Sequence, residues 1–290
     1  MANVPRWASR SMWGGSVYKT ARCRGLRSYS STPLKSALGT LYTACQRVMD
    51  NTDRLTKYEK ELQLFPADTN PASLWWTMVQ LHMPQKTEIE LVEFLEGAKM
   101  AAKTQLKAVN SKEFAEFAAG LTSESAVADE LSYYCTPRFF ENLKEAAAST
   151  LKDRNMTLEL QDINIESVVV ADVRYAQLTQ TEYEAQTAGL AVLPFLWAAD
   201  ATIEYMQINV KTRSLETTKM TLIGQEECLA LQDNSRTWTF GSKVGSFEEL
   251  EWRIVNTVGA NNAAKQLSRT VYADQVDDGN DMSLEDEQKL

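Results

Sequence analysis

The spacing of apolar residues changes once along this chain, and this change restricts the fold more than any other feature. Between residues 87 and 152, apolar side chains recur every three or four positions, as on one face of an amphipathic helix. Between residues 156 and 257 they alternate with polar ones and include many β-branched and aromatic residues, as in strands. Helices followed by strands indicate an α+β fold, with N-terminal helices packed on a curved antiparallel sheet.

The helical region divides into four predicted helices. The first has a single apolar face, made of Leu91, Leu95, Ala98, Ala102, Leu106 and Val109. Ser111 and Ser123 are placed to cap the second and third helices, because a serine hydroxyl can accept a hydrogen bond from a backbone N–H of the first turn. Thr136 followed by Pro137 is typical of the start of a fourth helix, since proline is favoured at the first helical position.

The alternating region predicts four or five strands. Apolar runs around Leu160 and Val170 are followed by alternation over residues 201–210, which slips at Met206-Gln207 and suggests a β-bulge there. A further strand is predicted to begin at Met220. In the last two strands an aromatic residue alternates with a second apolar residue, so both should face the helices. These predicted core residues are Trp238, Phe240, Trp252 and Ile254.

Residues 1–29 contain six basic residues and no acidic residue. The segment is also rich in serine and weakly amphipathic, which is the composition of a mitochondrial presequence. The sequence around Arg27 resembles a matrix-peptidase site and predicts cleavage between Tyr29 and Ser30. The alternative is a disordered basic arm of a cytosolic or nuclear protein, but such arms rarely exclude acidic residues for so long. Cleavage would change the formal net charge from −9 to −15.

Composition excludes several other classes of protein. No apolar run reaches the roughly 18 residues that a transmembrane helix needs. The net negative charge argues against binding to a phosphate backbone, so we expect no DNA partner. His82 is the only histidine and the four cysteines are widely spaced, so no metal site, disulfide framework or cofactor site is predicted. Cys135 and Cys228 lie in apolar surroundings, which predicts core packing in a reducing compartment.

Two segments flank the predicted domain, which covers residues 86–260. Residues 30–85 are predicted to form a helical extension whose last helix carries a pair of tryptophans. The tryptophans either contact a membrane interface or pack on the domain; we favour packing, because the segment lacks the basic residues usual in interfacial helices. Residues 261–290 become strongly acidic toward their end and are predicted to be a disordered tail.

Two more surfaces are candidates for contact with a membrane or a partner. One is an apolar cluster before residue 200, where Pro194 disfavours a central strand; the alternative is that this cluster begins the next strand. The other is a row of lysines on the first predicted helix, which either meets an acidic partner or faces solvent. The candidate contact residues are Trp75, Trp76, Phe195, Leu196, Trp197, Lys99, Lys103 and Lys107.

Catalysis would need a general acid or base in a cavity of the sheet region. The candidates there are Asp162, Asp172, Asp200 and Tyr205. That region contains no histidine, no glycine-rich phosphate loop and no nucleophile motif. We therefore predict that the protein is not an enzyme and assign no catalytic residue.

Four sequence elements occur in an order that resembles a known family. They are Phe94-Leu95-Glu96-Gly97-Ala98, residues 131–143 with Thr136-Pro137, Arg236-Thr237-Trp238-Thr239-Phe240, and Trp252-Arg253-Ile254. Over residues 87–258 this order resembles the Tim-forty-four-like domain, which often ends with a Trp-x-Phe strand and a Trp-x-Ile strand. The resemblance implies a cone-shaped fold like that of nuclear transport factor two.

The resemblance also implies a location and a role. Members of the family are matrix proteins on the mitochondrial inner membrane, either scaffolds of the protein-import motor or mitoribosomal proteins of the L-forty-five type. The short extension before the domain is closer to the ribosome-tethering type. The expected function is a non-enzymatic adaptor that ties the mitoribosome or a translocation machine to the membrane surface. The alternatives are an import-motor scaffold and an accessory subunit of a respiratory or ATP-synthase complex.

Overall fold

The computed structural model describes residues 33–154, 156–188, 201–222 and 226–271. Within these ranges, seven α-helices and one π-helical turn precede the sheet, and α8 follows its first strand. The helical elements are α1 (Pro33–Asp50), α2 (Thr52–Thr56), η2 (Lys57–Glu61), α3 (Pro71–Leu81), α4 (Leu91–Val109), α5 (Lys112–Ala118), α6 (Ala126–Tyr134), α7 (Pro137–Arg154), α8 (Gln180–Thr187) and the 3-10 turn η3 (Phe247–Glu249).

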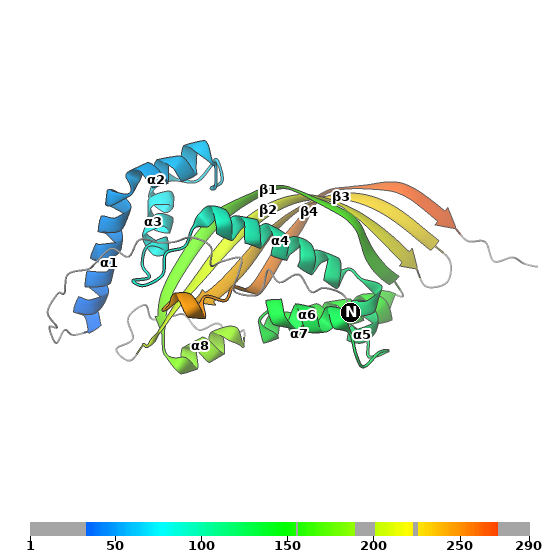
Figure 1. The fold of residues 1–290 in the computed structure, drawn as a ribbon. Coiled ribbons are helices and arrows are strands. Elements are labelled where there is room, and N and C mark those ends of the chain that lie inside the picture. The colour runs from blue at the N-terminus through cyan, green and yellow to red at the C-terminus, as the bar shows by residue number, and fades with distance from the viewer. Residues whose placement is uncertain (1–32, 155, 189–200, 223–225, 272–290) are drawn as a thin grey trace, which may run out of the picture.

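The strands form one antiparallel sheet in chain order, β1-β2-β3-β4. They are β1 (Met156–Leu178), β2 (Ile203–Leu222), β3 (Glu226–Lys243) and β4 (Arg253–Val271). The long sheet curves over the helices α4 to α7, which lie on its concave side (Figure 1). The α+β class predicted from the sequence is confirmed. β4 runs past residue 260 to Val271, and the apolar runs around Leu160 and Val170 belong to a single strand.

The bulge predicted at Met206-Gln207 is wrong. β2 keeps its register with both neighbouring strands there, and the register shifts against β2 lie in β1, where they follow Leu160, Ile165 and Val170. Tyr205 and Met206 are both buried, because the sheet has cover on both faces at this end. Alternation therefore fails without any change of backbone register. Met220 also begins no new strand, since β2 continues to Leu222.

The helix starts agree with the sequence at two sites, and at a third the cap is a different residue. Ser111 caps α5 by accepting a hydrogen bond from the N–H of Phe114 at 3.2 Å, and α7 begins at Pro137. The cap of α6 is Ser125 rather than Ser123; its hydroxyl accepts from the N–H of Ala128 at 3.1 Å. The hydroxyl of Ser125 is also fixed by Glu113, a long-range contact that sequence spacing does not reveal.

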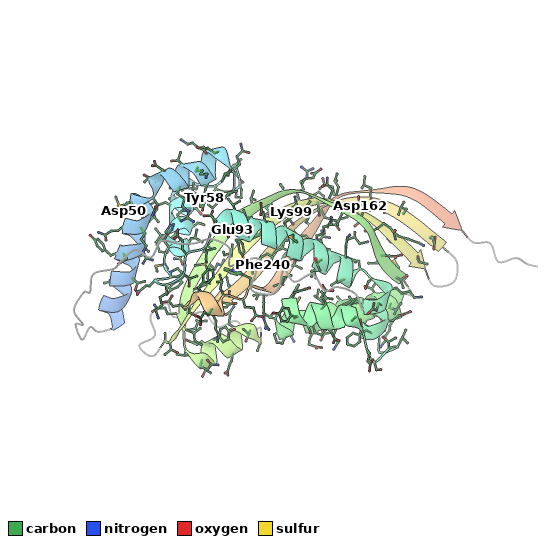
Figure 2. All side chains as sticks on the ribbon, in the orientation of Figure 1. Asp50, Tyr58, Glu93, Lys99, Asp162 and Phe240 are labelled. Carbon is green, nitrogen blue, oxygen red and sulfur yellow. The ribbon has the colours of Figure 1, made fainter. Side chains whose placement is uncertain are left out.

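The core lies between the concave side of the sheet and the helices. Trp238 is 0% exposed, and its indole N–H donates to the hydroxyl of Thr212 at 3.0 Å. Phe240 lies between the sheet and α4 (Figure 2), where its ring meets Phe94 edge-on with centroids 5.7 Å apart. Ile254 and Cys135 are also buried. Trp252, predicted as a strand residue, precedes β4 and is only partly buried against this core.

The N-terminal extension packs along β1, the first edge of the sheet. α3 contacts both α1 and β1. Three outward-pointing amides of β1 find acceptors beyond the sheet: Leu160 N–H donates to Asn110 O at 3.2 Å, Val170 N–H to Leu64 O at 2.7 Å, and Tyr175 N–H to the side chain of Gln80 at 2.8 Å. No helix in the described part of the chain is long and apolar enough to cross a membrane.

Candidate functional site

Two arginine-centred networks fix the extension: one holds it on the domain, and the other holds two of its helices together. Arg54 forms an ion pair with Glu88 and with Glu90 at 2.9 Å, and it donates to the hydroxyl of Tyr58 at 2.7 Å. The hydroxyl of Tyr58 in turn donates to Glu90 at 2.5 Å. Burial, with the hydrogen bond to this carboxylate, raises the pKa of Tyr58 well above its usual range. These charge-assisted bonds fix the orientation of the extension on the domain.

Arg47 forms the second network. Its guanidinium donates to the carbonyl oxygens of His82 at 3.1 Å and Pro84 at 2.8 Å, and so ties α1 to the end of α3. The N-cap of α3 is Asn70, whose side chain accepts from the N–H of Ala72 at 2.8 Å. α3 is therefore fixed at its start, its end and along its contacts with α1 and β1, and the side chains that it exposes have fixed positions.

Trp75 and Trp76 are the exposed large side chains of α3. They are 39% and 44% exposed, whereas Leu74 and every residue from Thr77 to Leu81 are buried. The packing that we favoured from the sequence is thus only partial, because other residues of α3 fill the contacts with α1 and β1 and leave the two indoles partly exposed. A tryptophan pair on a rigid helix is an amphipathic contact surface of the kind found at membrane interfaces and protein interfaces.

α1 exposes further apolar side chains. Leu38, Tyr42 and Met49 are all more than half exposed, while Ala44 and Val48 on the opposite face are buried. The exposed residues follow the spacing of one helix face, because they are separated by four and seven positions. The extension thus presents apolar side chains from two of its helices. The α1 row was not predicted, because helical spacing alone does not show which apolar residues of a helix stay exposed.

An aromatic pocket of about 570 Å³ lies between α4, α6 and the start of β4. Small residues of α4, including Gly97 and Ala101, form one wall, and Tyr133 and Phe247 contribute others. The ring of Trp252 packs on Phe94 with centroids 4.8 Å apart. Its buried indole nitrogen has no hydrogen-bond partner among the described residues. The pocket can accept an apolar group, but its walls also carry two glutamates, Glu248 and Glu251.

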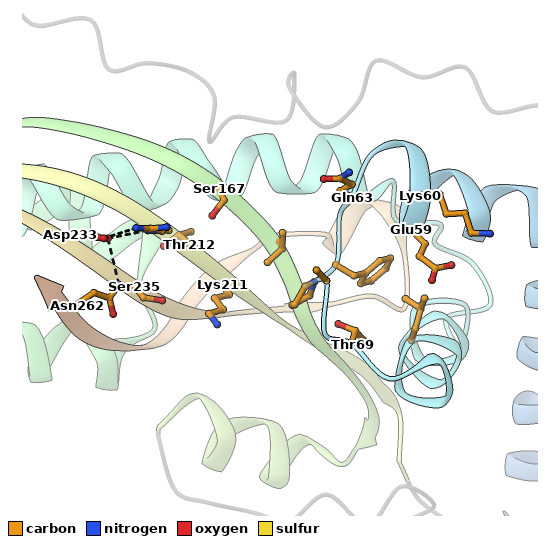
Figure 3. Close-up of a pocket in the computed structure, with 16 residues that line it drawn as sticks. Glu59, Lys60, Gln63, Thr69, Ser167, Lys211, Thr212, Asp233, Ser235 and Asn262 are labelled. Carbon is orange, nitrogen blue, oxygen red and sulfur yellow. Dashed lines mark hydrogen bonds and ion pairs between the residues drawn. The ribbon is translucent and has the colours of Figure 1, made fainter.

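A larger groove of about 1090 Å³ lies on the convex face, between the sheet and the chain that connects η2 to α3. Figure 3 shows Gln63 and Thr69 on the extension side, with Lys211 and Asp233 on the strands. Asp233 forms a two-point ion pair with Arg213 at 3.2 and 2.7 Å. The lining of this groove combines both signs of charge with apolar residues, so no single class of ligand is favoured here.

The three predicted lysines lie exposed on α4, and Lys99 is labelled in Figure 2. None of Lys99, Lys103 and Lys107 forms an ion pair with another described residue. Met100 lies beside them and is exposed as well. This face can therefore meet an acidic partner, but its charges are spread along a solvated helix rather than gathered around a cavity.

The concave face carries one buried ion pair. Glu216 is 2% exposed and pairs with Arg236, whose second nitrogen donates to the carboxylate at 2.9 Å. The same carboxylate accepts from Ser214 at 2.5 Å and Asn234 at 2.9 Å. All of its partners are fixed in the sheet, so this carboxylate is a structural group rather than a free base.

The candidates for catalysis do not come together. Asp162 is exposed, Asp172 pairs with Arg174 at 2.8 Å on the surface, and Tyr205 is buried, with its pKa raised by burial to about 12. Burial also raises the pKa of Cys135 to about 12, which keeps its thiol protonated. The described residues contain no group of three His, Cys, Asp or Glu that could hold a metal ion.

Several predicted features lie outside the described residues. They are the presequence, Asp200, the acidic end of the tail and the apolar cluster of Phe195, Leu196 and Trp197. No protein-family model matches the sequence, and no curated protein is significantly similar to it. The site is therefore argued from its own geometry, in which the tryptophan pair of α3 forms the exposed apolar part of the predicted contacts that the structure describes.

Proposed function

We propose that this protein is a non-enzymatic adaptor on the matrix side of the mitochondrial inner membrane, attached peripherally through the apolar side chains of its extension. The observation that carries the proposal is the exposure of Trp75 and Trp76 on a helix whose other side is buried. Burying a large apolar side chain stabilises binding by about 1.5–3 kcal/mol. Two such side chains can hold a protein at an interface without basic residues.

The attached complex is proposed to be the mitoribosome or a translocation and insertion machine. This follows the resemblance to the Tim-forty-four-like domain and its cone-shaped fold, together with the presequence-like residues 1–29. An import-motor scaffold is the alternative within the binding class. An accessory subunit of a respiratory or ATP-synthase complex is the alternative outside it. Co-migration of the tagged protein with one of these assemblies on a native gel distinguishes the three.

Membrane extraction tests the mode of attachment. We expect high salt to leave most of the protein with mitochondrial membranes, because the contact is apolar, and the double variant Trp75→Ser/Trp76→Ser to move at least half of it to the soluble fraction. The matched control is Lys99→Ser/Lys103→Ser, which changes two exposed residues of α4 instead. Complete release of the wild type by salt, or release by the lysine variant alone, would show that the attachment is electrostatic.

A further inference from the structure

The last strand of the sheet has an open outer edge. β4 pairs with β3 along one side, and at the other side its start meets Cys135 and Thr136, whose N–H donates to Ile254 O at 2.9 Å. Beyond Ile254, no backbone hydrogen bond to this side of β4 is formed by the described residues. Val258 is 65% exposed, and Gly259 and Ala260 are exposed as well.

The register shows which backbone groups point outward. In an antiparallel pair, the N–H and C=O of alternate residues point toward the partner strand and away from it. Ile254 points away from β3, since its carbonyl accepts from Thr136. After the register shift that follows Ile254, the groups of Thr257 and Gly259 point outward, and those of Val258 and Ala260 point toward β3. Between Asn256 and Asn261, the open edge thus offers a short, regular series of donors and acceptors that no described residue pairs.

Between Asn256 and Asn261, this edge carries none of the usual protection against strand pairing, because the register shifts of β4 lie before and after this stretch. Exposed edges are normally blocked by charges, proline or a covering element. From Ile254 to Ala264 the sequence contains no charged residue and no proline. An uncharged strand does not repel an identical strand, even in a chain whose formal net charge is −9.

We infer that this edge pairs with the same edge of a second copy, so that two β4 strands lie antiparallel and join two sheets into one. The difference between the two edges of the sheet indicates that the partner is a second copy of this chain. The opposite edge is covered at three points, two from the extension and one from Asn110 at the end of α4, so each copy has one open edge to offer. Pairing of like with like is isologous and closes at a dimer, whereas a sheet with two open edges would extend without limit.

The dimer is independent of the proposed membrane attachment, which uses α3. Sedimentation velocity of the purified full-length chain is the test, with the concentration varied over the micromolar range. We expect a species of twice 32.6 kDa at high concentration. The variant Val258→Lys adds one positive charge to the β4 edge of each copy. Because these like charges repel, the dimer dissociation constant should rise at least tenfold. The matched control, Thr217→Lys, adds the same charge to the half-buried β2 position Thr217 and should leave the constant unchanged.

A photo-crosslink identifies the paired surface. p-Benzoylphenylalanine in place of the exposed Asn262 should join two chains through their residues 253–264, and Val258→Lys should abolish this product. A chain that is monomeric at every concentration overturns the inference. So does a dimer that Val258→Lys leaves intact, or a crosslink from position 262 to the same chain's own tail, which would show that the edge is covered from within.

Discussion

The two edge strands of this sheet differ in how far the outer side of their backbone is covered. Both β1 and β4 expose one side of their backbone, and unpaired edges tend to associate with other strands. β1 is covered by carbonyl and amide oxygens from the extension and the α4–α5 junction, which accept from Leu160, Val170 and Tyr175. At β4 the N–H of Thr136 donates to Ile254 O near the start of the strand, and beyond it no described residue forms a backbone hydrogen bond to the outer side.

The difference shows what the N-terminal extension contributes to the domain. Its helices and loops cover the β1 edge with specific acceptors, and the same packing fixes α3 with its two tryptophans outward. The cover and the exposed contact surface are therefore one structural unit. Among the residues that the structure describes, no comparable segment covers β4, so its edge stays available to another chain.

The largest expected effect concerns the packing that covers β1. Met78 is 1% exposed on α3, so Met78→Ala should lower the free energy of unfolding by about 2–5 kcal/mol, from lost burial and a cavity. Val258→Ala, at the exposed edge, should change it by no more than about 0.5 kcal/mol. Denaturant unfolding at low protein concentration measures both. Equal losses would mean that β4 is as well covered as β1.

A smaller effect tests one acceptor of the cover. Gln80 is buried and accepts from the N–H of Tyr175 at 2.8 Å, so Gln80→Ala leaves a buried donor unpaired. The expected loss is about 1–3 kcal/mol. Gln46→Ala is the control, because Gln46 donates to Tyr42 on the exposed side of α1. If the two variants were equally stable, the side-chain contact to β1 would be dispensable.

The effect of pH on the stability of the packing that covers β1 should be smaller still. Burial lowers the pKa of His82, at the end of α3, below its usual value of about 6.5, although its ring nitrogen lies 2.8 Å from Met78 O. Arg54 and Arg47 act in the same direction and Glu88 against it. The unfolded chain then binds the proton of His82 more tightly than the folded chain does. The contribution of neutral His82 to stability is therefore fully present above about pH 6.5, and the free energy of unfolding falls as the pH drops below this value.

Melting temperatures at pH 7.5 and 5.5 check this prediction. Between these two pH values, the melting temperature of the wild type should fall further than that of His82→Gln. The variant removes the only histidine, whereas the carboxylates titrate in both proteins. An identical loss in the two proteins would show that His82 is not buried in its neutral form.

The sequence predicted the parts of the fold that depend on local periodicity. The buried face of α4, the cap at Ser111, the start of α7 at Pro137 and the order of helices before strands all follow from residues close together in the chain. The capping box of Thr179 and Glu182 also marks the start of α8, a signal that we missed. Local patterns succeed here because each element buries one face.

The edges and the site depend on contacts that periodicity cannot encode. Gln80 meets Tyr175 across 95 positions, and nothing near either residue in the sequence marks the pairing. The exposure of Trp75 and Trp76 likewise depends on how tightly α1 and β1 enclose α3. The bulges of β1 also escaped prediction, because its apolar residues read as two short strands rather than one curved strand.

Amide hydrogen exchange at single-residue resolution tests most directly the claim that one edge is covered and the other open. The measurement uses the monomeric Val258→Lys protein, or dilute wild type. The amides of Val170 and Tyr175 should exchange slowly, because both are bonded to the cover. Those of Thr257 and Gly259 should exchange rapidly, while Ala260, which points toward β3, stays protected. Equal protection of the outward amides on both strands in the monomer would contradict the account.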